Sequence, residues 1–197
     1  MPPVIHSRNP FAMYAPYPLG VTFEGQEKGE VIILLLRAHI ITLVPAVLAT
    51  TILLLAPIFV PSFLNLLNID LANFLSPVQT LLTGVFWYLL TFGYAFYKFI
   101  FWYFNVYLLT NERVVDFDFR GILHKETSYA KLLQIQDVSP KIIGFFGTFF
   151  HYGNVFLQTA GTKPEFEFHH VARPNEVAQA ILEQSRLEEG EPPGVVA

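Results

Sequence analysis

Two long apolar runs precede a region in which apolar and polar residues alternate. Ala38 to Val60 is 23 residues without a formal charge, and Val78 to Phe99 carries only Lys98. A helix rises 1.5 Å per residue, so about 20 residues cross the roughly 30 Å hydrocarbon core of a bilayer. The pattern predicts a two-helix transmembrane hairpin within residues 31–104, with spans at about 38–60 and 78–101.

The residues before the first span predict no packed structure. Residues 1–30 are rich in proline and polar residues, which favours a flexible N-terminal tail. Val31 to Leu36 is expected to lie along the interface, with Arg37 extending its charged head to the lipid headgroups. A proton relay through Arg37 and His39 is the alternative, but both residues stand at the end of the span, which favours an interfacial anchor.

The second span begins and ends with recognisable signals. Ser76 followed by Pro77 is typical of an N-cap and a first helical position. Aromatic residues crowd the C-terminal end of the span and include Trp102 and Tyr103, which is typical of the aromatic belt at a membrane–water boundary.

Residues 105–187 have the alternation of a β domain followed by an amphipathic helix. Val177 and Ile181 lie at helical spacing and are expected to pack in the core of this domain. Residues 188–197 are acidic and contain proline and glycine, which favours a disordered tail. The expected strands are 105–110, 113–119, 122–129, 134–139, 153–159 and 165–171, with a helical turn at 130–133 and a capping helix at 174–187.

An alternative reading makes Ile142 to Thr162 a third span, since these 21 residues carry no formal charge. Four glycines and the polar residues His151, Asn154 and Gln158 make this a poor lipid-facing helix, so we expect no span here.

The start of this segment is more apolar than an ordinary loop. Phe145, Phe146 and Phe149 are proposed to dip into the membrane interface, where burial of apolar surface is favourable. The alternative is that these phenylalanines fill the core of the β domain, and the sequence alone leaves both readings open.

Composition and charge support a membrane protein. The chain is 53% hydrophobic and only 14% charged, whereas soluble domains carry roughly 25% charged residues. Lys and Arg flank both spans and the connecting loop has neither, which predicts a multi-pass protein of the inner (cytoplasmic) membrane with both termini in the cytoplasm. Neither end is a polybasic arm, so no nucleic-acid partner is expected.

The residues that could carry chemistry form no catalytic pattern. Cysteine is absent, the six histidines lack metal-ligand spacing, and no phosphate-binding loop or nucleophile motif occurs. Asp116 and Asp118 share one strand face, which a solvated face opposite a Phe-lined core explains more simply than a catalytic pair does. We therefore expect no enzyme, no cofactor and no metal. Arg113 and Arg120 are the candidates for contact with a phosphate, and paired or solvated surface charge is the alternative.

Five short motifs together resemble a known family. They are Tyr107-Leu-Leu-Thr-Asn-Glu-Arg113, Arg120-Gly-Ile-Leu123, Ile135-Gln-Asp-Val138, Tyr152-Gly-Asn-Val155 with Thr159-Ala-Gly161, and Arg173-Pro-Asn-Glu-Val177. Over residues 100–185 they resemble the bacterial pleckstrin-homology-like domain of membrane-flanked proteins. The resemblance implies two antiparallel sheets, forming a barrel or sandwich, with a C-terminal capping helix. It implies an interaction module and little about chemistry.

Two functions follow as expectations. The first is a non-catalytic, membrane-anchored module that mediates protein interaction at the inner membrane face. The second is a module that binds lipid or a small ligand at the membrane surface. The expected partners are the lipid bilayer and a membrane or cytoplasmic protein of unknown identity, and a homo-oligomer is left open.

Overall fold

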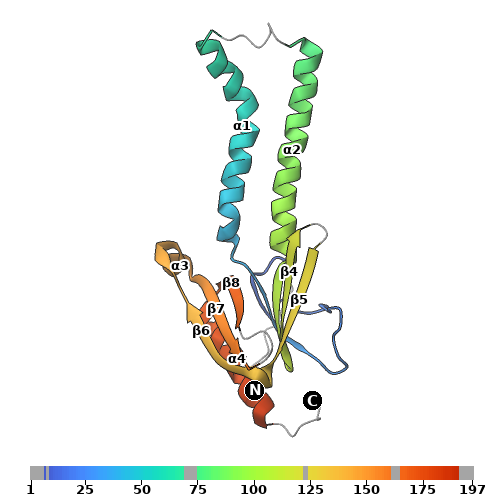
Figure 1. Ribbon diagram of the computed structural model, residues 1–197, viewed down its shortest axis with the longest axis vertical. Coiled ribbons are helices and arrows are strands. Elements are labelled where there is room, and N and C mark those ends of the chain that lie inside the picture. The colour runs from blue at the N-terminus through green and yellow to red at the C-terminus, as the bar shows by residue number, and fades with distance from the viewer. Residues whose placement is uncertain (1–6, 8, 69–74, 122–123, 161–164, 191–197) are drawn as a thin grey trace. The chain divides into compact units, whose positions relative to one another are not determined.

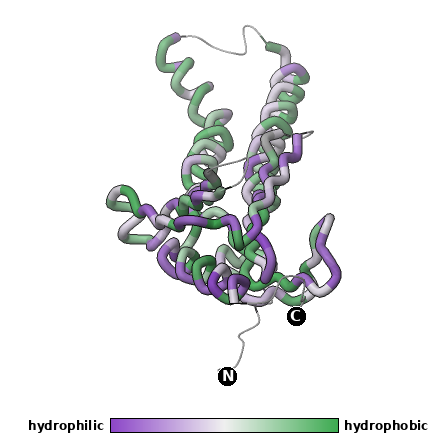
Figure 2. The backbone as a smooth tube through the Cα atoms, turned by 60° about the horizontal axis from the view of Figure 1, so that its bottom comes forward, coloured by the Kyte–Doolittle hydropathy of each residue, from purple (hydrophilic) through white to green (hydrophobic). Residues whose placement is uncertain are grey.

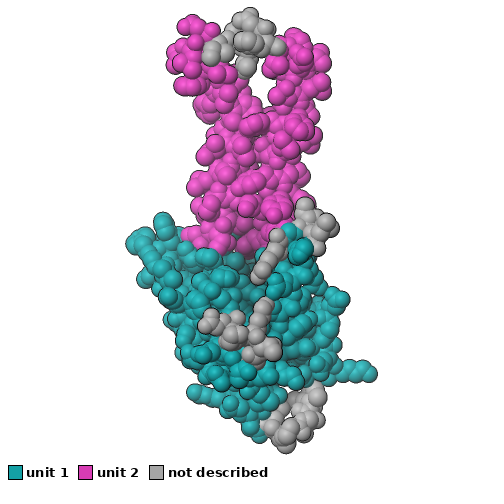
Figure 3. All heavy atoms as spheres, viewed as in Figure 1, with its two compact units in different colours: residues 1–40, 103–197 teal, residues 41–102 magenta. Residues whose placement is uncertain are grey.

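The chain forms two compact units, residues 1–40 with 103–197 (unit 1) and residues 41–102 (unit 2), coloured separately in Figure 3. A computed structural model describes residues 7, 9–68, 75–121, 124–160 and 165–190, with Arg120 and Glu165 described by their backbone alone.

Unit 2 consists mainly of two long apolar helices. After a 3-10 turn at Ile40–Leu43, α1 runs over Val44–Leu66 and α2 over Pro77–Phe104, beyond the end of the unit. Both are long and apolar enough to cross a membrane, and hydrophobic residues follow most of their length in Figure 2. The predicted cap at Ser76 is confirmed: its hydroxyl accepts from the Gln79 backbone N–H at 3.3 Å, and its own N–H donates to the Gln79 side chain at 2.8 Å.

An indole hydrogen bond joins the two helices where a proline interrupts α1. Pro57 has no N–H to donate to the carbonyl of Leu53, four residues earlier. Trp87 of α2 supplies the missing donor, with its Nε1 at 2.8 Å from the Leu53 oxygen. The backbone group freed by Pro57 is therefore satisfied within the helix pair, as an apolar surrounding requires.

Unit 1 contains two antiparallel sheets, as the resemblance implied (Figure 1). The first has the order β1-β2-β3-β4-β5, from β1 (Tyr14–Pro16), β2 (Ile32–Arg37), β3 (Val106–Thr110), β4 (Arg113–Gly121) and β5 (His124–Lys131). The second has the order β6-β7-β8, from β6 (Ile135–Lys141), β7 (Tyr152–Thr159) and β8 (Glu165–Ala172). The remaining elements are η3 (Leu132–Gln134), α3 (Gly144–Phe150) and α4 (Pro174–Gly190).

The C-terminal helix α4 closes the core of unit 1. Val177 and Ile181 are fully buried and belong to one cluster with Val155 and Phe168 of the second sheet, so the prediction of their burial is confirmed. The Ser185 hydroxyl donates to the Leu132 carbonyl at 3.0 Å and fastens the end of α4 to η3. The helix continues to Gly190, so the predicted tail begins too early; residues 191–197 lie outside the described part of the chain.

The prediction for residues 31–37 is wrong, because most of this run is a strand. β2 pairs with β1 on one side and β3 on the other. Leu34 and Leu36 belong to one core cluster, whereas Ile32 and Leu35 belong to another, so both faces of the strand are covered. A strand that is buried on both faces reads as a continuous apolar run and cannot be told from a lipid-facing segment by its pattern.

The N-terminal prediction is also wrong, for a different reason. Residues 1–30 were expected to form no sheet, but Tyr14–Pro16 adds an edge strand to β2, and Glu30 is buried. Proline is tolerated in an edge strand because one side of that strand needs no ladder hydrogen bonds.

The alternative of a third span is excluded by the fold. Within Ile142 to Thr162, the described residues form the short helix α3 and then β7, the central strand of the second sheet.

The helix pair is inserted between two neighbouring strands. The chain leaves the first sheet after Arg37 and returns at Val106, and these two residues are paired across β2 and β3. Residues 38–105 are therefore one long connection between adjacent antiparallel strands. The points at which the chain leaves and re-enters the sheet are therefore neighbours in the strand ladder.

Candidate functional site

A buried arginine holds the end of the sheet from which the helices depart. Arg37 donates from Nε to the Tyr103 carbonyl at 3.0 Å and from Nη1 to the Ala12 carbonyl at 3.1 Å. Its guanidinium also lies over the Tyr103 ring, 4.7 Å from the centroid. Arg37, the last residue of β2, thus contacts Tyr103, the residue at which the chain returns to unit 1.

These contacts correct two of the residues predicted at a membrane interface. Arg37 is only 7% exposed and its head is committed to backbone carbonyls, so it cannot extend freely to headgroups. Trp102 is also buried, which contradicts a ring lying free in an aromatic belt; Tyr103 is half-buried.

His39 connects the departing chain to the second sheet. Its backbone N–H donates to the His170 carbonyl at 2.7 Å, and its ring stacks on Tyr152 with centroids 5.3 Å apart. The ring also lies 6.3 Å from that of Phe150, the last residue of α3. Burial lowers the pKa of His39, which favours the neutral ring at pH 7.

Helix α3 displays its phenylalanines to the outside. Phe145, Phe146 and Phe149 are 76%, 61% and 64% exposed, so the alternative that they fill the core is wrong. They form one continuous patch with Phe150, because successive rings lie within 4.9 to 6.5 Å of each other. Figure 2 shows α3 as a projecting hydrophobic turn.

Glycines determine which face of α3 turns inward. Gly147 is the buried residue of the helix, and a Cβ there would meet the Tyr152 carbonyl at 3.1 Å. At Gly153 a Cβ would lie 2.5 Å from the Lys141 carbonyl. The close approach of α3 and β7 at Gly147 therefore favours glycine on the inner face of α3, and the phenylalanines lie on the outer face. The contact at Gly153 concerns the packing of β7 against the end of β6.

A cavity of about 870 Å³ borders this patch. Its lining includes Tyr14, His39, Phe150 and Arg173. Arg173 is paired with Glu176 at 3.3 Å, so it is not presented as a free cation. The rest of the lining mixes apolar residues, such as Met13 and Ile142, with the polar residues His151 and Asn175.

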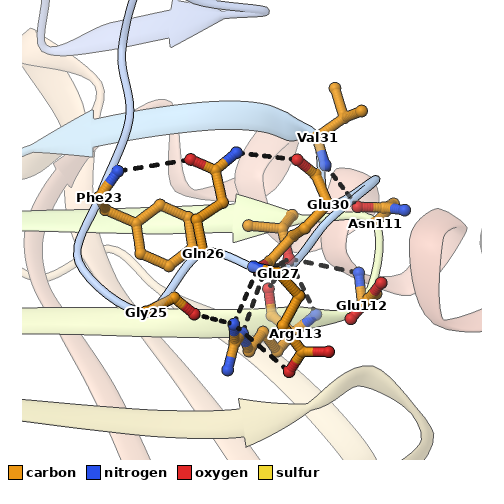
Figure 4. A network of polar contacts seen from close by, with 10 residues as sticks. Phe23, Gly25, Gln26, Glu27, Glu30, Val31, Asn111, Glu112 and Arg113 are labelled. Atoms are coloured by element: carbon orange, nitrogen blue, oxygen red, sulfur yellow. Dashed lines mark hydrogen bonds and ion pairs between the residues drawn. The ribbon is translucent and has the colours of Figure 1, made fainter.

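A second polar network lies around Glu30 (Figure 4). The Glu30 carboxylate is fully buried and accepts from Arg113 Nε at 2.9 Å and Nη2 at 2.8 Å. The Thr110 hydroxyl at 2.8 Å and the Glu27 backbone N–H at 2.9 Å also donate to it. Asn111 exchanges two hydrogen bonds with the Val31 backbone, which completes the attachment of residues 25–31 to the turn between β3 and β4.

Arg113 is committed mainly to this network. Besides Glu30, it donates to the Gly25 carbonyl at 2.7 Å, and its guanidinium lies between the rings of Phe23 and Tyr129 at 5.8 and 5.1 Å. Because its charge is paired and its Nε and Nη2 groups already donate to Glu30 and Gly25, Arg113 is a weaker candidate for the predicted phosphate contact. The side chain of Arg120, the other candidate, lies outside the described residues.

Sequence reasoning missed Glu30 altogether and placed it in the flexible N-terminal tail. Its partner is 83 residues away, so no local pattern could have joined the two. The signal that existed was the pair of short polar segments next to apolar strands: residues 24–30 before β2, and residues 111–113 at the turn between β3 and β4.

The comparisons with known proteins give one family and one solved structure. The family model described as "Bacterial PH domain" matches residues 31–185. A crystal structure of a DUF1696 family protein with a pleckstrin-homology domain, from Shewanella loihica PV-4, is 19% identical. The alignment has a TM-score of 0.33 and covers 41% of this chain and 69% of that one. No curated protein matches the chain.

Proposed function

Because the chain belongs to the bacterial PH domain family, we propose that it is a non-catalytic module that mediates protein interaction at the inner face of the membrane, anchored there by α1 and α2. PH domains are generally non-catalytic and commonly bind lipids or proteins. The observation that carries the proposal is the insertion of two apolar helices between the paired strands β2 and β3.

This insertion fits a domain that is held at the membrane better than a domain on a flexible linker. A flexible linker would let a domain drift from the bilayer, whereas Arg37 and Val106 are ladder partners and Arg37 also binds the Tyr103 carbonyl. A membrane that holds the helices would therefore hold unit 1 at its surface. The Lys and Arg residues that flank the helices support a cytoplasmic location for unit 1.

We do not assign recognition of a lipid headgroup to basic side chains at the turn between β3 and β4. Arg113, the first residue after the turn between β3 and β4, has its charge paired with Glu30. The candidate surface for a protein partner is the cavity beside α3, whose rim includes the exposed Asn175.

Topology can be tested cleanly because the chain has no cysteine. Asn68→Cys, after α1, and Gln179→Cys, on α4, both replace exposed polar residues. In intact cells an impermeant thiol reagent should label position 68 and not 179, and permeabilisation should expose both. Labelling of 179 but not 68 in intact cells, or release of the protein by alkaline carbonate, would refute the anchored arrangement.

The protein partner is tested by a photo-crosslinking residue at Asn175, with Gln179 on the same helix as the matched control. We expect a crosslinked protein species from position 175 in native membranes. Equal crosslinking from both positions, or from neither, would count against this surface.

A further inference from the structure

The exposed patch on α3 is expected to contact another molecule or a membrane. It is formed by Phe145, Phe146, Phe149 and Phe150. Three of these rings are more than 60% exposed, and the inward face of the helix is taken by Gly147. An ordinary amphipathic helix turns its largest apolar side chains toward the core. Here the arrangement is reversed, and contiguous exposed apolar surface marks contact with a protein or a membrane.

The surroundings of α3 favour the membrane over a protein as the contact of this patch. Phe150 and Tyr152 lie against the ring of His39, and Ala38 forms a bridge with Val171 of β8. His39 directly precedes Ile40, the first residue of the apolar helical segment Ile40–Leu66. The patch is therefore attached within unit 1 to the residue at which the chain departs for the first candidate span.

Helix length places that departure point at the depth of the headgroups. The segment Ile40–Leu66 has 27 residues, or about 40 Å at 1.5 Å per residue. A bilayer measures roughly 40–45 Å with its headgroup regions included. A spanning segment of this length would release the chain at its polar boundary, where phenylalanine side chains can enter the interface.

We infer that α3 is a third point of membrane contact, in which Phe145, Phe146 and Phe149 insert into the lipid interface. The patch therefore contacts lipid and not a protein. This inference rests on the proposed anchoring, and it adds that unit 1 is oriented with its α3 end against the bilayer. The first turn of α4 borders the cavity beside Phe150. Leu187 lies 13 residues further on, about 20 Å along the helix axis. In this orientation the C-terminal end of α4 lies away from the lipid.

Depth-dependent quenching in the full chain tests the inference. Single-cysteine variants Phe146→Cys and Leu187→Cys replace apolar residues of similar exposure, 61% and 56%. Each is labelled with an environment-sensitive fluorophore and reconstituted in phosphatidylcholine vesicles with and without doxyl-labelled phosphatidylcholine. We expect a blue-shifted emission and strong doxyl quenching at 146, and neither at 187. In the 146 variant, adding Phe145→Ser and Phe149→Ser should weaken the quenching several-fold, since less apolar area remains to be buried.

Each other result overturns the inference in a distinct way. Equal behaviour of the two probes, in a protein that resists carbonate extraction, would leave the anchor standing and remove the contact of α3 with lipid. A probe at 146 shielded from both doxyl lipid and aqueous iodide would assign the patch to a protein or a second copy of the chain. A marked loss of thermal stability in the serine variant would mean that these side chains are core residues. Release by carbonate would instead refute the anchoring itself.

Discussion

Replacing Arg113 by alanine should destabilise unit 1 strongly, although the residue lies near the surface. The change leaves the Glu30 carboxylate buried with two of its four donors, the Thr110 hydroxyl and the Glu27 N–H. Removing one partner of a buried ion pair costs about 3–5 kcal/mol. For a chain of this size, 1 kcal/mol corresponds to roughly 2–4 °C in the midpoint of thermal unfolding. We expect the midpoint of Arg113→Ala to fall by about 10 °C.

The matched control is Arg173→Ala, which also removes an arginine paired with a glutamate. The Arg173–Glu176 pair is exposed on both sides, and such pairs contribute about 0–1 kcal/mol. The measurement is thermal unfolding of the full chain in nanodiscs, followed by near-ultraviolet circular dichroism. Equal losses in the two variants would refute the structural role of Arg113.

Acid should reveal the same interaction. Burial of Glu30 favours its neutral form, but hydrogen bonds from Arg113, the Glu27 N–H and Thr110 outweigh this and hold its pKa below the ordinary value. The ion pair therefore stabilises the fold fully above the unfolded pKa of about 4.3, and this contribution is lost as the pH falls through the lower folded pKa. Glu30→Gln should be less stable than the parent at pH 7 and should lose less stability between pH 5 and pH 3. An unchanged acid dependence would exclude Glu30 as the titrating group.

Three further substitutions test the packing. Ile181→Ala should cost about 2–5 kcal/mol, because it opens a cavity in a fully buried site. Trp87→Phe removes the donor to the Leu53 carbonyl and should cost on the order of 1 kcal/mol in the stability of the helix pair. Gly153→Ala should cost about 1–3 kcal/mol, since its Cβ would meet the Lys141 carbonyl at 2.5 Å. Unfolding midpoints of the full chain in nanodiscs check all three.

Each of these variants has a control elsewhere in the chain. Leu187→Ala truncates an exposed residue of the same helix as Ile181 and should change stability by less than about 0.5 kcal/mol. Gly84→Ala adds a Cβ in α2 that meets nothing within 4 Å, and it should be neutral or slightly stabilising. Tyr88→Phe removes only a long contact of 3.5 Å to the Leu54 carbonyl, so its effect should be smaller than that of Trp87→Phe. A control that matched its test variant would contradict the corresponding contact.

The local pattern of the sequence was enough for the elements whose burial follows one period. The strands β6, β7 and β8 and the helix α4 lie within a few residues of their predicted positions. Val177 and Ile181 were found from helical spacing alone, because only one face of α4 meets the core. The two long apolar helices and the cap at Ser76 were likewise predictable, since length, hydropathy and capping are local properties.

Three features were decided only by tertiary structure. β2 was mistaken for part of the helical hairpin because covering both faces of a strand removes the alternation that identifies it. The pairing of Glu30 with Arg113 depends on a contact across 83 residues, which no periodicity records. The sequence did not decide whether the phenylalanines of α3 point outward. A run of seven residues rich in phenylalanine fits a buried helix and a surface helix equally well. What favours the outward direction is the close approach of α3 to β7, where a Cβ on Gly147 would lie 3.1 Å from the Tyr152 carbonyl.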